Sequence, residues 1–200
     1  MKLYTAPGSC SSAAHICLVR AELDFEAIKV DLRGDRSLPD GRHLNDINPK
    51  GYVPVLELDD GQFLTENVAI LQYIADLKPE SALAPANGTL DRVRLQEWLG
   101  FINSEIHKGF GALFNPDLPE VAKDMTIERL KGRMDYLENS LAGRNYLMGA
   151  QFTVVDAYLF IVLGWAPMFN FDLSPYPNVT AYLDRVAQVD AVKRVTAGQG

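Results

Sequence analysis

Cys10 is the residue of this chain whose surroundings most favour side-chain chemistry. It follows a short apolar segment at residues 2–5 and a Pro7-Gly8 turn, and it precedes small residues that predict the start of a helix. A thiol at that place lies near the positive end of the helix dipole and near unpaired backbone N–H groups, which favour the thiolate. The serines that offer side-chain caps to these groups are Ser9, Ser11 and Ser12. The sequence therefore predicts a reactive cysteine, against the alternative of a small residue in a tight turn.

A strand, a turn and a cysteine in this order are typical of the opening of a thioredoxin-type unit. The Cys-x-x-Cys form of that motif is absent, because position 13 is Ala. Cys17 is about 10 Å further along the same predicted helix, too far for a disulfide, and its apolar neighbours predict a core position. Since no disulfide framework is available, the sequence indicates a cytosolic protein.

The composition excludes several classes of function. The 200 residues are 48% hydrophobic and 22% charged, as in ordinary globular proteins of one large or two small domains. The net charge of −7 disfavours a nucleic-acid partner, which needs a clustered basic surface. No apolar run approaches the roughly 20 residues that span a bilayer, and no signal-peptide pattern precedes the first strand. We expect a soluble, cytoplasmic protein with no metal and no membrane partner.

The order of predicted elements changes near residue 80. Before it, the patterns predict strands at 2–5, 27–31, 53–58 and 62–64, and helices at about 11–21 and 67–77. The last two strands are joined by Asp59-Asp60-Gly61, a strong hairpin signal. This βαβ-ββα order predicts a mixed four-stranded sheet with a right-handed crossover. We therefore expect a thioredoxin-like α/β domain at 1–79, a linker at 80–88 and an all-α domain at 89–200.

The helix predicted at about 90–110 has two distinct faces. One is an apolar stripe that predicts burial, formed by Leu95, Trp98, Leu99, Ile102 and Ile106. The other is small and polar, formed by Gly100, Asn103, Ser104, His107 and Gly111. Such a face can line a cleft, and its small residues leave room around the imidazole of His107.

Thr153 and Asp156 have the spacing of a capping box directly before the apolar run 157–163. We interpret this pair as structural, because it would begin a central buried helix. Loss of either side chain should cost about 1 kcal/mol or somewhat more in stability, with little direct effect on chemistry.

Several segments together resemble the glutathione transferases. They are Ser9-Cys10-Ser11, Asn48-Pro-Lys-Gly-Tyr-Val53-Pro54, Leu64-Thr-Glu66-Asn67, Glu105-Ile-His107-Lys108 and Phe152-Thr-Val-Val-Asp156. The resemblance covers essentially the whole chain, and its motifs occur in order at similar spacing. It is strongest to the bacterial beta class, in which a cysteine takes the place of a catalytic tyrosine or serine.

This resemblance implies a role for residues of the first domain. Val53-Pro54 would be a cis-proline turn, whose Val53 backbone groups pair with the cysteinyl backbone of glutathione like a short added strand. Glu66 and Asn67 would begin the third helix, where backbone amides hold the γ-glutamyl carboxylate and Glu66 meets the ammonium. The alternatives are a plain strand-entry proline and simple helix capping.

The resemblance also assigns His107 to the side of the active site that faces Cys10, where the imidazole would stabilise a thiolate or take a proton. Ser104 and Glu105 match positions that contact glutathione, one or both across a dimer interface.

The chain departs from the family pattern at two places. Gly100 stands where an asparagine is common, with Asn103 as a substitute one turn along. The lysine of the loop after the second strand is missing, with Arg33 or Arg36 as the replacement.

The resemblance implies a homodimer and a second substrate that is a small hydrophobic electrophile. Aromatic residues of the helical domain are the candidates to contact it, namely Phe110, Phe114, Tyr158, Trp165 and Phe169, although aromatics at helical spacing are more often core. The sequence does not identify the electrophile.

Three functional interpretations follow. In the first, which we favour, the enzyme binds glutathione, stabilises its thiolate and adds it to an electrophilic carbon. In the second, Cys10 forms a mixed disulfide with glutathione that a second glutathione resolves. In the third, the fold is a non-enzymatic glutathione-binding module. The joint presence of Cys10, Val53-Pro54, Glu66 and His107 weighs against the third.

Overall fold

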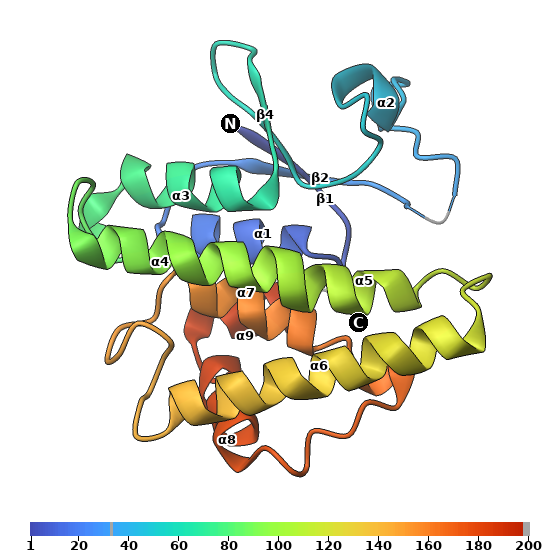
Figure 1. Ribbon diagram of the computed structural model, residues 1–200. Helices are drawn as coiled ribbons and strands as arrows, with labels where there is room; N and C mark the ends of the chain where they lie inside the picture. Colours follow the sequence, from blue (N-terminus) through green and yellow to red (C-terminus); the bar gives the residue numbers. More distant parts are fainter. Residues whose placement is uncertain (33, 198–200) are drawn as a thin grey trace. The chain divides into compact units, whose positions relative to one another are not determined.

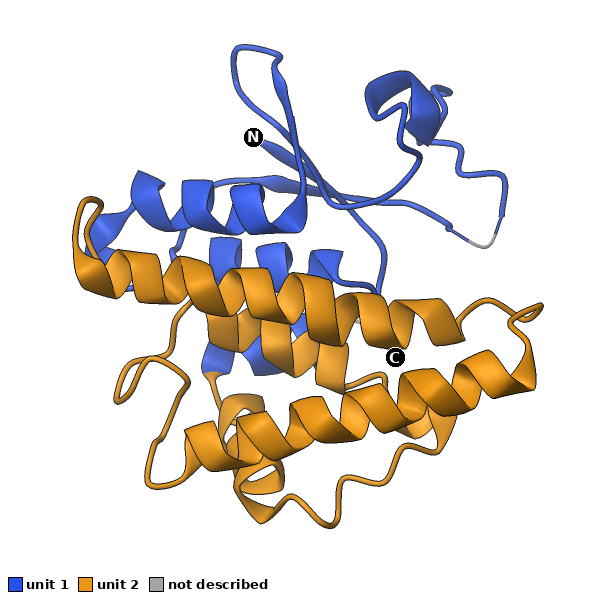
Figure 2. Ribbon diagram, in the orientation of Figure 1, with its two compact units in different colours: residues 1–84, 190–200 blue, residues 85–189 orange. Residues whose placement is uncertain are grey.

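A computed structural model describes residues 1–32 and 34–197 of the chain (Figure 1). The chain forms two units, one of Met1–Ala84 with Asp190–Gly200 and one of Pro85–Val189 (Figure 2). The division between them falls inside the linker predicted at 80–88. Only the end of the chain requires a correction, because helix α9 (Asp190–Ala197) belongs to the first unit and packs against α1. An amphipathic pattern predicts a buried helix face but does not identify the element that covers it.

The first unit contains the predicted mixed sheet. Its strands are β1 (Lys2–Thr5), β2 (Glu26–Lys29), β3 (Val55–Glu57) and β4 (Phe63–Thr65), in the order β2-β1-β3-β4. β1 is parallel to β2 and antiparallel to β3, and β4 is antiparallel to β3. This is the βαβ-ββα topology expected from the sequence. β3 starts later than predicted, at Val55, after Pro54, which has no N–H to donate to a ladder.

Among the described residues before position 84, this unit also contains three helices. They are α1 (Ser11–Arg20), α2 (Leu44–Ile47) and α3 (Asn67–Leu77), with a 3-10 turn at Pro79–Ser81. α1 and α3 pack against each other, and both lie close to their predicted ranges. The sequence did not predict α2, because four residues are too few to show a helical period.

A capping box stabilises the N-terminus of α2. Nδ1 of His43 accepts a hydrogen bond from the Asn45 N–H at 3.1 Å, and the His43 N–H donates to the Asp46 carboxylate at 2.7 Å. Leu44 and Ile47 of this helix are buried in a cluster that also contains Tyr4, Val30, Val53 and Val55. This small second core holds Val53 in place.

The second unit is helical, as predicted. Its elements are α4 (Leu90–Phe101), a π-helix (Ile102–His107), α5 (Lys108–Leu113), α6 (Glu120–Leu141), α7 (Val154–Leu163), a 3-10 turn (Ala166–Phe169) and α8 (Pro177–Ala187). Across the residues that the structure describes, no helix combines the length and apolar character needed to cross a membrane.

The prediction of one continuous α-helix at about 90–110 is wrong, because a π-helix separates α4 from α5. Single π turns occur mostly inside α-helices and often at functional sites. Most of the predicted apolar stripe is fully buried, namely Leu95, Leu99, Ile102 and Ile106. Trp98 is only half-buried, because its ring lies against Phe101 and Tyr136, and the Tyr136 side chain is itself exposed.

The predicted capping box at the start of α7 is present. The Asp156 carboxylate is fully buried and accepts hydrogen bonds from the N–H and hydroxyl of Thr153 at 2.8 and 2.9 Å. It also accepts from the Leu147 N–H at 2.9 Å and from the Tyr182 hydroxyl at 3.1 Å. Burial raises the pKa of Asp156 to about 6, so the carboxylate is still largely ionised at neutral pH. The box therefore joins three segments as well as capping a helix.

Replacing Asp156→Ala removes the acceptor of four donors, and each buried donor left unpaired costs about 1 to 3 kcal/mol. We expect the free energy of unfolding in urea at pH 7 to fall by at least about 3 kcal/mol. Asp184→Ala, which removes an exposed carboxylate of the same unit on α8, is the matched control and should change it by less than about 0.5 kcal/mol. An Asp156→Ala protein that kept its unfolding midpoint but lost turnover would contradict the structural role.

Candidate functional site

Cys10 occupies the N-cap position of α1, where the sequence placed it, but its side chain makes no capping hydrogen bond there. Its side chain is half-buried, and its Sγ donates a hydrogen bond to the carbonyl of Val53 at 3.6 Å. The Val53–Pro54 peptide bond is cis, as predicted. Cys17 is fully buried in the core, also as predicted. The thiol and the Val53 backbone, which are 43 residues apart in sequence, therefore meet at one place.

The serines beside Cys10 bind the loop to β1. The Ser11 hydroxyl accepts from the Ala6 N–H at 3.0 Å and is bonded to the Thr5 hydroxyl at 2.8 Å. The Ser11 N–H donates to the Ser9 hydroxyl at 3.3 Å, which is the capping contact that the sequence suggested. Ser12 is buried. These bonds fix the turn from which the thiol projects.

Asn67 connects this turn to the start of α3. Its side-chain Nδ2 donates to the carbonyl of Cys10 at 3.2 Å, and the residue is buried. That carbonyl can only accept, so the bond fixes the orientation of the amide. Its Oδ1 is also buried, and the described residues provide no donor to it. Asn67 therefore positions Cys10 relative to the third helix.

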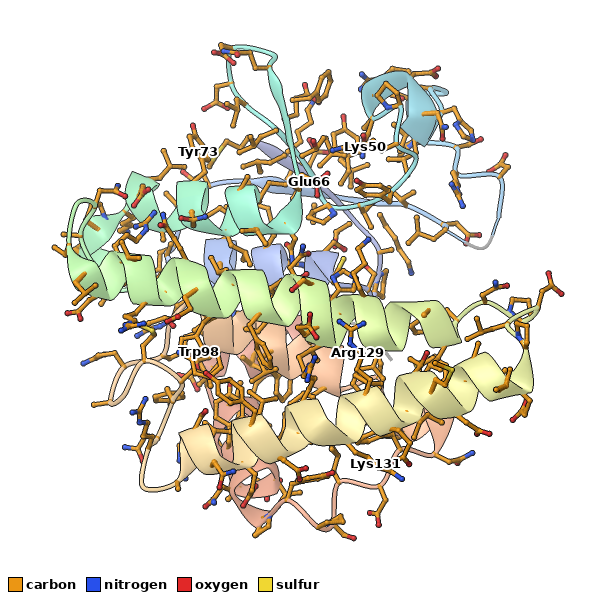
Figure 3. The ribbon with its side chains drawn as sticks, in the orientation of Figure 1. Lys50, Glu66, Tyr73, Trp98, Arg129 and Lys131 are labelled. Atoms are coloured by element: carbon orange, nitrogen blue, oxygen red, sulfur yellow. The ribbon has the colours of Figure 1, made fainter. Side chains whose placement is uncertain are left out.

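Glu66 precedes α3 in a left-handed backbone conformation, with φ of 70°. A non-glycine residue held there is costly and is found mainly at functional sites. The Glu66 side chain is 55% exposed, and its Oε1 accepts from the Tyr52 hydroxyl at 2.8 Å and from the Lys50 ammonium. Lys50 also bonds the Thr65 hydroxyl at 2.9 Å. Figure 3 labels Lys50 and Glu66, which lie close together in the first unit. This carboxylate thus already recognises an ammonium group within the chain.

Sequence reasoning missed Lys50 and Tyr52 as site residues. The Lys50 ammonium lies 5.4 Å from the centre of the Tyr52 ring, within the range of a cation–π contact. The hydrogen bonds to Glu66 raise the pKa of Lys50 and of Tyr52. Both residues occur in the segment that carried the resemblance, but nothing in their spacing indicates that they reach a residue 14 to 16 positions away.

Of the two arginines proposed to replace the family lysine, the structure describes one. Arg33 lies outside the described residues. Arg36 has a positive φ of 61°, and its Nη1 donates to the carbonyl of Gly51 at 2.9 Å. Arg36 therefore holds the loop that carries Lys50 and Tyr52.

In the second unit, His107 ends the π-helix and is half-buried. Its Nδ1 is bonded to the hydroxyl of Tyr158, which donates to Oδ1 of Asn103 at 3.0 Å. Trp165 lies edge-on to the imidazole, with ring centres 5.1 Å apart. Burial and, to a lesser extent, the nearby Lys108 charge lower the pKa of His107 to about 4. The imidazole is therefore neutral at pH 7.

Among the described residues, the side chains of the other site residues predicted on the π-helix form no hydrogen bond or ion pair with His107. Glu105 pairs with Arg129 at 2.8 Å and with Arg133 at 2.7 Å, and these two α6 guanidinium groups lower its pKa. Ser104 is exposed, and Asn103 holds Tyr158. The structure does not bring Ser104 and Glu105 into the His107 cluster.

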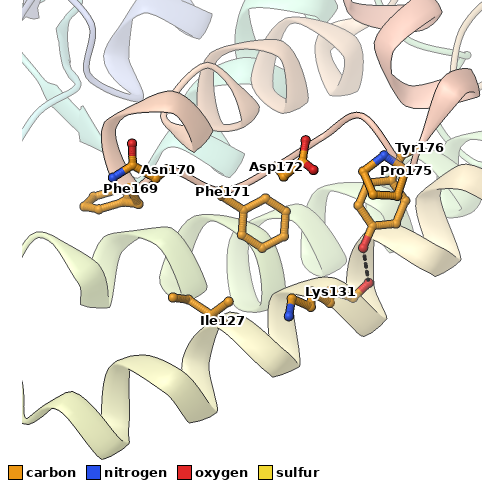
Figure 4. A pocket seen from close by; sticks show the side chains of 8 residues that line it. All are labelled: Ile127, Lys131, Phe169, Asn170, Phe171, Asp172, Pro175 and Tyr176. Atoms are coloured by element: carbon orange, nitrogen blue, oxygen red, sulfur yellow. Dashed lines mark hydrogen bonds between the residues drawn. The ribbon is translucent and has the colours of Figure 1, made fainter.

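The aromatic residues proposed to contact a second substrate differ in how much of each side chain is exposed. Phe110 and Tyr158 are fully buried and Trp165 is 7% exposed, whereas Phe114 is 46% exposed. Phe114 packs edge-on against Trp165 and Phe169. Phe169 also lines a pocket of about 400 Å³ between α6 and the segment before α8 (Figure 4). Phe114 and Phe169 are therefore the most accessible of the candidates.

In the described part of the chain, no group of three His, Cys, Asp or Glu side chains is arranged to hold a metal ion.

Comparison with known proteins gives consistent results. The family model described as "Glutathione S-transferase, N-terminal domain" matches residues 8–77, and the "Glutathione S-transferase, C-terminal domain" model matches residues 101–190. The protein named Glutathione S-transferase GstA from Escherichia coli O157:H7 is 41% identical over 201 residues, covering 100% of this chain and 99% of the relative.

Solved structures agree with these matches. A sphingomonad glutathione S-transferase complexed with glutathione is 46% identical with a TM-score of 0.95, covering 100% of this chain and 99% of the other. A bacterial beta class glutathione S-transferase from Sphingomonas chungbukensis is 44% identical with a TM-score of 0.94 and the same coverage.

The geometry predicts a large difference in reactivity between the two thiols. Iodoacetamide should alkylate the half-buried Cys10 at the start of α1, while the fully buried Cys17 should react at least about 100-fold more slowly, because it must await local opening. Mass spectrometry of tryptic peptides over a time course measures both rates. Equal rates, or faster labelling of Cys17, would contradict the site.

Proposed function

The chain belongs to the glutathione S-transferase family, and from this premise we propose that it is a beta-class enzyme that conjugates reduced glutathione to hydrophobic electrophiles. The observation that carries the proposal is the contact between the Cys10 thiol and the Val53 carbonyl, next to the cis Val53–Pro54 bond. The related sphingomonad glutathione S-transferase, whose structure is a complex with glutathione, supports the choice of substrate.

In this proposal the first unit binds the tripeptide. The Val53 backbone pairs with the cysteinyl backbone of glutathione, and its carbonyl has a second lone pair for a ligand N–H while it accepts from Cys10. The backbone N–H groups at the start of α3 hold the γ-glutamyl carboxylate. Glu66, which binds the Lys50 ammonium in this structure, takes the γ-glutamyl ammonium. The glutathione thiol is thereby directed to Cys10.

The reaction we propose uses the glutathione sulfur as nucleophile. The sulfur forms a bond to an electrophilic carbon, the leaving group departs with the electron pair of its own bond, and the thiol proton passes to a base. Because a glutathione thiol is mostly protonated at neutral pH, lowering its pKa by one unit raises the reactive fraction about tenfold. Cys10 and His107 are assigned to this adjustment, and the exposed Phe114 and Phe169 to contact with the electrophile.

A second candidate function is thiol-disulfide exchange through Cys10. The Cys10 thiolate would attack a glutathione mixed disulfide and release the substrate thiol, and a second glutathione would restore Cys10 and leave as oxidised glutathione. The burial of Cys17, which cannot serve as a resolving thiol, favours this monothiol route.

We further propose that the protein is a cytoplasmic homodimer that acts in detoxification. Family membership supports the dimer, as does an aromatic group that lies partly exposed on α4 and α6, namely Trp98, Phe101 and Tyr136. The two cysteines without disulfides support a reducing compartment.

Cys10→Ala distinguishes the two chemistries. Conjugation of glutathione to 1-chloro-2,4-dinitrobenzene should stay within about tenfold of the wild type, because glutathione supplies the nucleophile. Reduction of a glutathione mixed-disulfide substrate should vanish, because no other accessible thiol of the chain can replace Cys10. Abolition of both activities in a folded variant would rule out this division of roles, and failure of the wild type to bind immobilised glutathione would favour the binding-module alternative.

Glu66→Gln tests ammonium recognition. Removing the charge while keeping the shape should raise the KM for glutathione about tenfold or more, because a charge-assisted hydrogen bond becomes a neutral one. The kcat at saturating glutathione should change much less. Glu26→Gln, an exposed carboxylate on β2, serves as the control and should leave both constants unchanged. An unaltered KM in the Glu66 variant would refute the assignment.

A further inference from the structure

The hydrogen bonds around His107 determine which of its nitrogens carries the proton. A hydroxyl has a single proton, and that of Tyr158 is donated to Oδ1 of Asn103 at 3.0 Å. The same hydroxyl is bonded to Nδ1 of His107, so in that bond it must accept. With the Asn103 amide in this orientation, Nδ1 carries the imidazole proton and Nε2 has a lone pair.

From this chain of bonds we propose that Tyr158 and Asn103 are positioning residues, which hold His107 as the Nδ1–H tautomer so that Nε2 receives the proton of the glutathione thiol. The inference rests on the proposed function for the identity of the proton donor. The sequence analysis named Tyr158 as a candidate to contact the electrophile through its aromatic ring. In the structure its hydroxyl is instead hydrogen-bonded to both His107 and Asn103.

The surroundings of the imidazole support an uncharged starting state. Tyr158 comes from α7, Trp165 lies edge-on to the ring, and the neighbouring charge is the Lys108 ammonium on α5. The carboxylate of Glu105, on the same π-helix, is held by Arg129 and Arg133 from α6. A base must begin without a proton, and burial with a cation nearby keeps His107 in that form.

The proton transfer is balanced within these groups. The thiol proton moves to Nε2, and the electron pair of the S–H bond stays on sulfur as the thiolate. The resulting imidazolium keeps its Nδ1–H bond to Tyr158, whose hydroxyl continues to donate to Asn103. The proton on Nε2 then leaves to solvent or to the departing group.

Nitrogen-15 NMR of the protein labelled at histidine tests the tautomer without any substrate. The chain has three histidines, and His43 is an internal reference of the opposite kind, because its Nδ1 accepts from the Asn45 N–H and its proton must lie on Nε2. At pH 7 we expect an unprotonated Nε2 for His107, whereas the neutral form of His43 should have an unprotonated Nδ1. An unprotonated Nδ1 in His107 would overturn the proposal.

Substitutions of the two partners should change the tautomer in different ways. Tyr158→Phe keeps the ring but removes the acceptor, so His107 should become a mixture of tautomers. Asn103→Leu leaves the Tyr158 hydroxyl to donate to Nδ1, so the tautomer should invert. Asn103→Asp retains an acceptor and should preserve the Nδ1–H form. Tyr146→Phe, a half-buried tyrosine of the same unit that packs on Phe152, is the control and should change nothing.

Kinetics then link the tautomer to the reaction. Tyr158→Phe and Asn103→Leu should lower kcat for conjugation by about ten- to a hundredfold with little change in the KM for glutathione, and Asn103→Asp should restore most of it. Unchanged His107 spectra in folded Tyr158→Phe protein would refute the positioning role. A wild type with the expected tautomer but no conjugating activity would instead refute the proposed function.

Discussion

The first unit depends on a junction of three chain segments around Cys10. The thiol donates to the carbonyl of Val53, and the Cys10 carbonyl accepts from the amide of Asn67. The segments come from the start of α1, the turn before β3 and the start of α3, so the junction is complete only when the sheet and both helices are in place. Because each bond uses a different atom of Cys10 or its peptide, the position of the sulfur is fixed from two sides. Reactivity at this thiol is thus a property of the whole unit.

Much of this unit could be predicted from sequence because its signals are local. The Pro7-Gly8 turn, the Asp59-Asp60-Gly61 hairpin and the period of α3 each depend on neighbouring residues. The helix start at Cys10 is local in the same sense, as is the capping box of Thr153 and Asp156 in the second unit. Helix α2 was missed since four residues show no period, and its stability comes from the buried cluster around Val53.

Long-range pairings could not be predicted. Sequence spacing does not indicate that Lys50 and Tyr52 meet Glu66, or that Glu105 pairs with two arginines of α6. The same limit applies to α9, which covers α1 rather than joining the helical unit. The π-helix at 102–107 is a further case, because its apolar residues fit an ordinary helical stripe equally well. Tertiary packing determines these long-range contacts, the position of α9 and the π-helix. The same packing determines which groups surround Glu66 and His107.

The two polar groups assigned to the proposed chemistry already have hydrogen-bond partners within the protein. Glu66 binds an internal ammonium before any ligand arrives, and His107 lies at one end of a chain of side-chain hydrogen bonds. Such sites are pre-organised, since little rearrangement is needed for the groups to act. A ligand ammonium has only to take the place of Lys50 or to share the carboxylate with it.

The central claim is that glutathione lies along the junction of Cys10, Val53 and Glu66, and titration with S-methylglutathione tests it most directly, since this ligand cannot form a disulfide. In amide NMR spectra of nitrogen-15-labelled protein, the account predicts that the largest saturable shifts occur at Cys10, Val53, Glu66 and Asn67. Saturable shifts confined to the pocket lined by Phe169 and Tyr176, with these amides unmoved, would contradict it.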